Sequence, residues 1–164
     1  MPIVSFTSLP DPSRVWVFGS GRPLDAVAES ALLAAVDRYL ATWKAHGEPL
    51  TVSRDWRDHR FLTIAVDSSQ TYASGCSIDG LFRELKTLES QAGISLVGGG
   101  TVYYRDGSGE IQNVDRGEWI EMGEQGRVTR ETPVFDFTVQ TLGDWRARFE
   151  TTAGQSWHNA LLTA

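Results

Sequence analysis

Hydrophobic residues along the chain form short strand-like runs and two longer stripes at helical spacing. Runs rich in β-branched and aromatic residues predict strands at residues 14–18, 50–56, 61–66, 101–104 and 111–114. Apolar residues three or four positions apart predict one helix from about residue 26 to about 45 and a second from 78 to 92, ended by Gly93. The second stripe consists of Ile78, Leu81, Phe82, Leu85 and Leu88.

The order of these elements predicts an α+β fold. Through residue 104 the order is strand, helix, strand, strand, helix, strand, which is typical of a split βαβ, ferredoxin-like layer. After residue 114 the pattern loosens and predicts a short helix around Trp119, a strand near 134–137 and a helix near 142–149. We therefore expect a ferredoxin-like core at residues 1–114 and a C-terminal α/β extension at residues 115–164, packed on the core as one compact unit.

Composition and charge narrow the classes of partner. The 164 residues are 41% hydrophobic and 22% charged, which is ordinary for a globular protein. A formal net charge of −6 gives no general attraction to nucleic acid or to anionic membranes, so we expect neither as a partner. The sequence shows no export leader and no apolar stretch of spanning length, and its single cysteine suits a reducing compartment. We expect a soluble, cytoplasmic protein.

The segment Ser74-Gly75-Cys76-Ser77-Ile78-Asp79 lies where a predicted strand gives way to the second predicted helix. A thiol at this place lies near the positive end of the helix dipole, which favours the nucleophilic thiolate. We expect Ser77 to cap the helix and Asp79 to lie in its first turn, where a carboxylate suits the dipole but opposes the thiolate. A buried, inert cysteine is the commoner case, so structure alone also explains this segment.

A nucleophilic cysteine usually needs a histidine as its base. His46 is the best candidate, because it is predicted to end the first helix beside Gly47 and Glu48, although a solvated histidine also commonly caps a helix. Asp67 ends the predicted strand 61–66, where α/β proteins often bind ligands, but an aspartate there also commonly orders a loop. The expected ligand-binding residues are Ser74, Gly75, Ser77, Asp79, Asp67 and Glu48.

Spacing argues against several enzyme classes. A phosphatase loop would need an arginine where Phe82 stands, and the zinc deaminase pattern lacks its proline and second cysteine. Thioredoxin-like chemistry needs two cysteines. Three histidines and one cysteine without paired spacing predict no metal site, and no cofactor motif is present, so we expect no cofactor.

Two segments of the chain are distinctive: Trp43-Lys44-Ala45-His46-Gly47-Glu48-Pro49-Leu50, and the segment from Ser74 to Asp79. Together with residues 14–17 and 60–67 they resemble a family of small bacterial proteins of unknown function, whose members often carry the label ABC transporter ATPase. The glycine-rich stretches at 19–23 and 98–101 lack the lysine and the spacing of a phosphate-binding loop. The resemblance therefore implies a family but no activity, and we do not expect an ATPase.

A second resemblance covers residues 106–145. Gly109-Glu110-Ile111, the run 126–135 and Trp145 resemble the layout of GYF-like modules, which bind proline-rich peptides through aromatic grooves. The tryptophan of that layout is replaced here by Phe135-Asp136. The resemblance implies a peptide-binding annex, and the alternative is an extension that simply covers the sheet.

Two hypotheses about function remain. The first, which we favour, is a non-catalytic binding or regulatory module that presents its surface to a protein or small-molecule partner. It explains why no complete catalytic set is present. The alternative is a cysteine-dependent hydrolase or transferase, with Cys76 as nucleophile, His46 as base and backbone amides at 77–79 as oxyanion donors.

Overall fold

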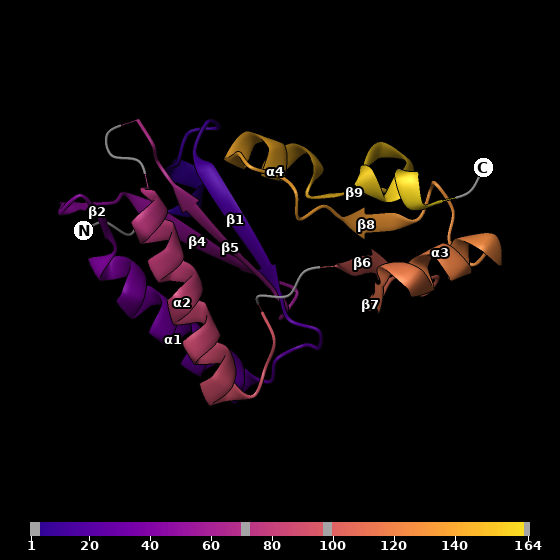
Figure 1. The fold of residues 1–164 in the computed structure, drawn as a ribbon, viewed down its shortest axis with the longest axis horizontal. Coiled ribbons are helices and arrows are strands. Elements are labelled where there is room, and N and C mark those ends of the chain that lie inside the picture. Colours follow the sequence, from indigo (N-terminus) through magenta and orange to yellow (C-terminus); the bar gives the residue numbers. More distant parts are fainter. Residues whose placement is uncertain (1–3, 70–72, 97–99, 163–164) are drawn as a thin grey trace. The chain divides into compact units, whose positions relative to one another are not determined.

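The computed structural model describes residues 4–69, 73–96 and 100–162. The chain forms two compact units (Figure 1). The first unit consists of Met1–Gly98 and Val139–Trp145, and the second of Gly99–Thr138 and Arg146–Ala164. The predicted α+β class is confirmed. None of the helices in the described residues has the length and apolar character that crossing a bilayer requires.

The first unit contains a three-stranded antiparallel sheet in the order β1-β5-β4. Its strands are β1 (Arg14–Gly19), β4 (Val52–Arg57) and β5 (Phe61–Val66). Every residue of the central strand β5 is buried, as its unbroken apolar run predicts. The predicted strands at 50–56 and 61–66 are confirmed and pair as an antiparallel hairpin, which Asp58 and His59 turn with positive φ angles.

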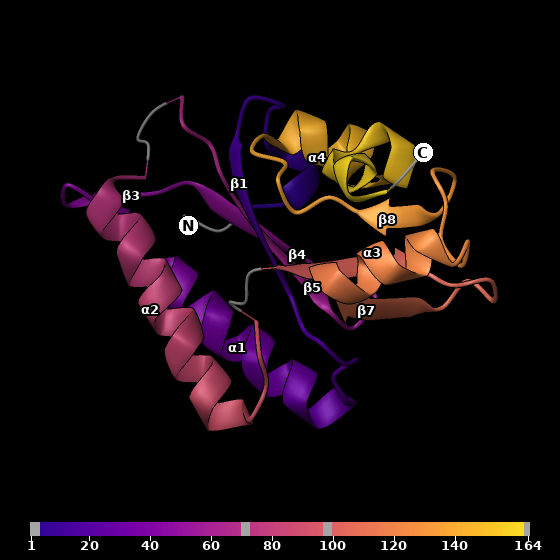
Figure 2. The ribbon, with the colours of Figure 1, turned by 45° about the vertical axis from the view of Figure 1, so that its right-hand side comes forward.

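Two helices lie side by side along one face of this sheet (Figures 1 and 2). They are α1 (Ala26–Thr42) and α2 (Gly75–Ala92). The Asp25 side chain accepts a 2.8 Å hydrogen bond from the Ala28 amide and so caps α1. Gly93 ends α2 in the left-handed region, at φ 67°. Both predicted helices are confirmed, although α1 ends about three residues before its predicted end.

Because α1 ends early, His46 lies outside the helix. Trp43 is extended, and the chain then forms a small hairpin of β2 (Lys44–Ala45) and β3 (Glu48–Pro49). His46 and Gly47 turn this hairpin with φ angles of 53° and 80°. The prediction that His46 ends the first helix is therefore wrong. Helical spacing continues to Trp43 because that side chain is buried, so the apolar stripe alone does not mark where the helix ends.

The predicted fourth strand of the ferredoxin-like layer does not join the sheet of the first unit. That stretch is β6 (Thr101–Arg105), which pairs with β7 (Ile111–Asp115) and β8 (Pro133–Phe135) in a separate sheet. The edge of β1 is instead met by a later segment, since the Val15 amide donates to the Gln140 carbonyl at 3.0 Å and Arg14 bridges to Thr141. The strand order does not confirm the complete layer.

The second unit has a four-stranded antiparallel sheet in the order β7-β6-β8-β9, where β9 is Glu150–Thr152. Helix α3 (Arg116–Glu124) covers one face of it, and Trp119 and Met122 pack there against Val102 and Tyr104 of β6 (Figure 2). The predicted boundary between residues 114 and 115 lies inside this unit, because β7 and α3 share its core. Whether the extension packs on the core stays a prediction.

The remaining elements are short. Helix α4 (Leu142–Arg148) lies where the sequence predicts a helix. The described residues also include three 3₁₀ turns, namely η1 (Phe6–Ser8), η2 (Ala153–Gln155) and η3 (Trp157–Leu161).

Candidate functional site

The segment around Cys76 forms the first turns of α2. The helix begins at Gly75, and the Ser74 hydroxyl accepts a 3.2 Å hydrogen bond from the Ser77 amide. The cap is therefore Ser74, and the prediction that Ser77 caps the helix is wrong. Ser77 is buried inside the first turn, where its hydroxyl donates to the Ser74 carbonyl at 2.8 Å. Asp79 lies beyond the first turn and is exposed, so its predicted place is also wrong.

The two distinctive sequence segments meet at one buried hydrogen bond. The indole Nε1–H of Trp43 donates to the Ser77 carbonyl oxygen at 2.8 Å. The ring of Trp43 also lies edge to face with Trp16 at 6.0 Å between centroids. One turn further along α2, a Cβ added to Gly80 would lie 2.8 Å from the Tyr39 hydroxyl oxygen. Tyr39 of α1 and Trp43 just after it therefore hold the start of α2, and Trp16 of β1 packs against Trp43, so packing explains much of both segments.

The other predicted site residues have structural or solvent-exposed places. Asp67 accepts a 2.9 Å hydrogen bond from the Ser69 amide and orders the loop after β5. Glu48 and His46 are exposed in the β2–β3 hairpin, and Cys76 is an exposed free thiol. In the described part of the chain, neither Cys76 nor His46 forms a side-chain hydrogen bond, so no thiol–base pair is assembled. Nor do the described residues contain a group of three His, Cys, Asp or Glu able to hold a metal ion.

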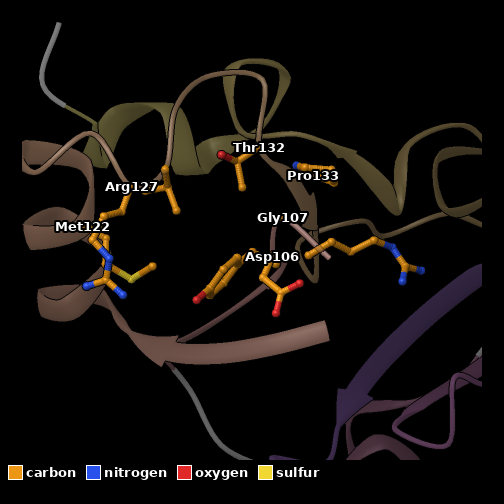
Figure 3. Close-up of a pocket in the computed structure, with 9 residues that line it drawn as sticks. Asp106, Gly107, Met122, Arg127, Thr132 and Pro133 are labelled. Atoms are coloured by element: carbon orange, nitrogen blue, oxygen red, sulfur yellow. The ribbon is translucent and has the colours of Figure 1, made fainter. Parts of the chain in front are cut away.

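A second candidate site, which sequence reasoning missed, lies in the second unit. Two adjoining cavities of about 310 and about 170 Å³ share Tyr104, Met122 and Arg127. Figure 3 shows the residues that line the larger of the two. We call the pair the Tyr104 trough. The first cavity is lined by Tyr104, Arg105, Asp106, Gly107, Met122, Arg127, Val128, Thr132 and Pro133. The second is lined by Tyr104, Val114, Glu118, Glu121, Met122 and Arg127.

One end of the trough is fixed by the turn between β6 and β7. The Asp106 carboxylate accepts hydrogen bonds from the Ser108 hydroxyl at 2.6 Å and from the Gln112 side-chain amide at 3.1 Å, as well as from two backbone amides. The bonds from Ser108 and then Gln112 lower the pKa of Asp106 to about 2. Gly109 closes the turn at φ 85°, which favours glycine. A permanent negative charge thus stands in a rigid turn at this end.

The floor of the trough is Tyr104. Its side chain is 9% exposed and its ring lies 5.7 Å from that of the fully buried Trp119, between centroids. Among the described residues the Tyr104 hydroxyl has no hydrogen-bond partner. Burial raises the pKa of Tyr104, Arg127 opposes this, and Asp106 and Glu118 add to it. Three charged residues of the trough walls, Arg127, Asp106 and Glu118, therefore influence the pKa of the Tyr104 phenol.

The two arginines of the trough differ. Arg105 is held by Glu150 through bonds of 2.7 and 3.1 Å, and it also donates to the Gly109 carbonyl. Arg127 is exposed, and its side chain reaches only the Gln125 side chain, at 3.5 Å. The guanidinium of Arg127 is therefore available to a ligand, whereas that of Arg105 is part of the framework.

The chemistry of the trough suits binding. It offers a phenol, guanidinium groups, carboxylates and a thioether, but the described residues that line it include no cysteine or histidine that could form a nucleophile–base pair. The signals in the sequence were the inward alternation of Val102 and Tyr104 and the Asp-Gly-Ser-Gly turn that follows them.

Comparisons of the chain with protein-family models, with curated proteins and with solved structures find no significant match. The two family resemblances therefore stay predictions. The function is argued below from the trough and from α2.

Proposed function

We propose that this protein is a non-catalytic binding module whose ligand site is the Tyr104 trough. The observation that carries the proposal is the Tyr104 hydroxyl. It belongs to a side chain that is nine-tenths buried, it lies at the floor of both cavities, and no described residue bonds to it. The ring of Tyr104 is buried, but its hydroxyl oxygen is not among the buried polar atoms without a partner, so it is open to the trough and can donate to or accept from a ligand.

The surroundings of the hydroxyl support this proposal. The Asp106 turn and the contact of Tyr104 with Trp119 fix the floor and one end before any ligand arrives. A preformed site loses little conformational entropy on binding. Arg127, by contrast, is held only loosely and can adjust to a ligand.

The finer fold assignment is also a proposal. We infer that the first unit is a ferredoxin-like layer without its usual last strand. Its support is that β5 lies between β1 and β4, and that one helix follows β1 and another follows β5. The segment at 140–141 occupies the edge of β1 where the last strand of such a layer would pair. A cytoplasmic location remains a proposal based on the single cysteine.

The cysteine-dependent alternative has weaker support. Cys76 is exposed in the first turn of an 18-residue helix, which favours an anion near the thiol. However, its predicted base His46 lies in a hairpin turn and bonds to neither Cys76 nor another described side chain. Binding without catalysis is therefore the better supported function.

Two-dimensional NMR of the ¹⁵N-labelled full chain tests the proposal. The probes are inorganic phosphate, acetate, and the N-acetyl methylamides of lysine, arginine, leucine and proline, each added at millimolar concentration. We expect at least one probe to shift the amides of Asp106, Gly107, Met122 and Arg127. Shifts confined to residues 75–80, or no shifts with any probe, would count against the trough as the ligand site.

A further inference from the structure

The walls of the Tyr104 trough carry more negative than positive charge. Glu118 and Glu121 line it from α3, and Asp106 lines it from the β6–β7 turn. Arg105 is neutralised by Glu150, which leaves Arg127 as the available cation among the lining residues. Three carboxylates thus face one available guanidinium. We propose that the trough takes a basic, extended peptide segment of a partner protein.

The inference rests on the proposed function and adds the class of ligand. The Tyr104 hydroxyl is the observation that points to a ligand independently of the acidic wall, because its residue is nine-tenths buried while the hydroxyl itself opens into the trough and has no partner among the described residues. It can donate to a peptide carbonyl or accept from a peptide amide. The loosely held guanidinium of Arg127 can donate to a second carbonyl.

The two adjoining parts of the trough favour an extended chain over a compact molecule. They share Tyr104, Met122 and Arg127, and together their linings include the Asp106 turn and the acidic side of α3. An extended peptide advances about 3.3 Å for each residue, so a few residues can occupy both parts. Main-chain bonds then supply affinity while the walls select side chains.

The walls select a side chain that is apolar along its stem and positive at its end. Met122, Val114 and Val128 present apolar surface to the methylene groups of a lysine or arginine. The carboxylates of Glu118 and Glu121 can then receive the charged end. Glu118 lines the same cavity as Tyr104, so this carboxylate and the hydroxyl can act on one ligand.

An anionic ligand fits the trough less well. Arg127 could hold a phosphate or a carboxylate, but Asp106, Glu118 and Glu121 would oppose any anion placed beside it. The pKa of Asp106, about 2, keeps that carboxylate charged at neutral pH. By contrast, the three carboxylates attract a basic segment, and only the Arg127 guanidinium among the groups named here repels it.

The test is selection from a displayed library of random peptides of about nine residues, about 30 Å when extended, on the immobilised full-length protein. We expect the recovered peptides to be enriched in Lys and Arg next to apolar residues. The affinity of a recovered peptide is then measured for the wild type, for Glu118→Gln with Glu121→Gln, and for Glu124→Gln. Glu124 is exposed on α3 but does not line the trough, so it is the matched control.

We expect the double variant to bind about fivefold or more weakly, the control to bind as the wild type does, and all affinities to fall as salt rises from about 50 to about 300 mM. Recovery of acidic peptides, recovery of no peptide, or equal binding by the double variant would overturn the inference. If phosphate or acetate shifts the trough amides in the NMR experiment while basic peptides do not bind, the proposed function survives and the basic-peptide inference fails. If no probe shifts those amides, both fail.

Discussion

The indole of Trp43 donates its N–H to the carbonyl oxygen of Ser77, and this 2.8 Å bond joins the two most distinctive segments of the chain. Both residues are buried, at 3% and 7% exposure. Since the Ser77 carbonyl belongs to the first turn of α2, the bond fixes where that helix starts. The residues around Cys76 therefore have a structural role whether or not the thiol reacts.

Changing Trp43 to Phe should destabilise the first unit by about 0.5–1.5 kcal/mol, because it removes the buried bond from the indole to the Ser77 carbonyl oxygen, which then keeps only its helical bond within α2. Urea unfolding followed by circular dichroism measures the loss. Trp56→Phe is the matched control, since the Trp56 Nε1–H is buried without a partner and its removal breaks no bond. Equal losses in the two variants would show that ring volume, and not the Trp43–Ser77 bond, matters.

The effect of Gly80→Ala on stability should depend on the residue at position 39. The Tyr39 hydroxyl oxygen is the atom that an added Cβ would meet, at 2.8 Å, so the substitution should cost about 1 kcal/mol in the wild type. In a Tyr39→Phe background the same substitution should stabilise α2 by about 0.5–1 kcal/mol, because alanine is the better helix former. A double-mutant cycle of unfolding free energies measures both values. Additive effects would contradict the contact.

The stability of the second unit should fall at mildly acidic pH because of His158. This side chain is fully buried, its Nδ1 lies 2.6 Å from the Ser156 hydroxyl, and burial lowers its pKa from 6.5 to about 4. The unfolded chain binds the proton more readily, so the stabilisation is complete above pH 6.5 and is lost as the pH falls towards 4. A shift from 6.5 to about 4 corresponds to roughly 3 kcal/mol.

Urea unfolding at a series of pH values between 7 and 4.5, about the range of the His158 transition, measures this dependence. The His158→Gln variant provides the comparison, because its side chain does not titrate. We expect a steeper pH dependence in the wild type than in the variant. If the unfolding free energies of the wild type and the variant fall equally with pH, His158 does not cause the loss of stability.

Cys76 should behave as an accessible thiol without a dedicated base. It is exposed, and His46 forms no side-chain hydrogen bond in the described residues. The rate of modification by iodoacetamide across pH should therefore be unchanged by His46→Ala, and Cys76→Ala should unfold at the same urea concentration as the wild type. A clear loss of thiol reactivity in His46→Ala would instead support the cysteine-dependent enzyme.

Local patterns predicted most of the elements but not their partners. The apolar run 61–66 and the stripe from Ile78 to Leu88 each identified a buried element, because burial on a strand or a helix leaves a regular pattern. Strand 101–104 was also identified, yet its assignment to the first sheet was wrong. Which strand edge it joins depends on contacts far apart in sequence, such as that between Val15 and Gln140.

The candidate site was harder to predict. Cys76 attracted attention as the single cysteine, but reactivity depends on a base that the fold does not bring to it. Tyr104 looked like an ordinary strand residue. Its importance depends on a hydroxyl left without a partner and on charges from α3 and the Asp106 turn, which only the folded chain brings together.

The most direct test of the account is the affinity of the probe that gives the largest shifts at the trough, compared for the wild type, Tyr104→Phe and Tyr39→Phe. Tyr104→Phe removes only a hydroxyl that has no partner among the described residues, so the fold should be unaffected. Loss of one ligand hydrogen bond predicts binding about three- to tenfold weaker in Tyr104→Phe and unchanged binding in Tyr39→Phe, whose hydroxyl lies in the first unit. Equal affinities for the wild type and Tyr104→Phe would contradict the central claim.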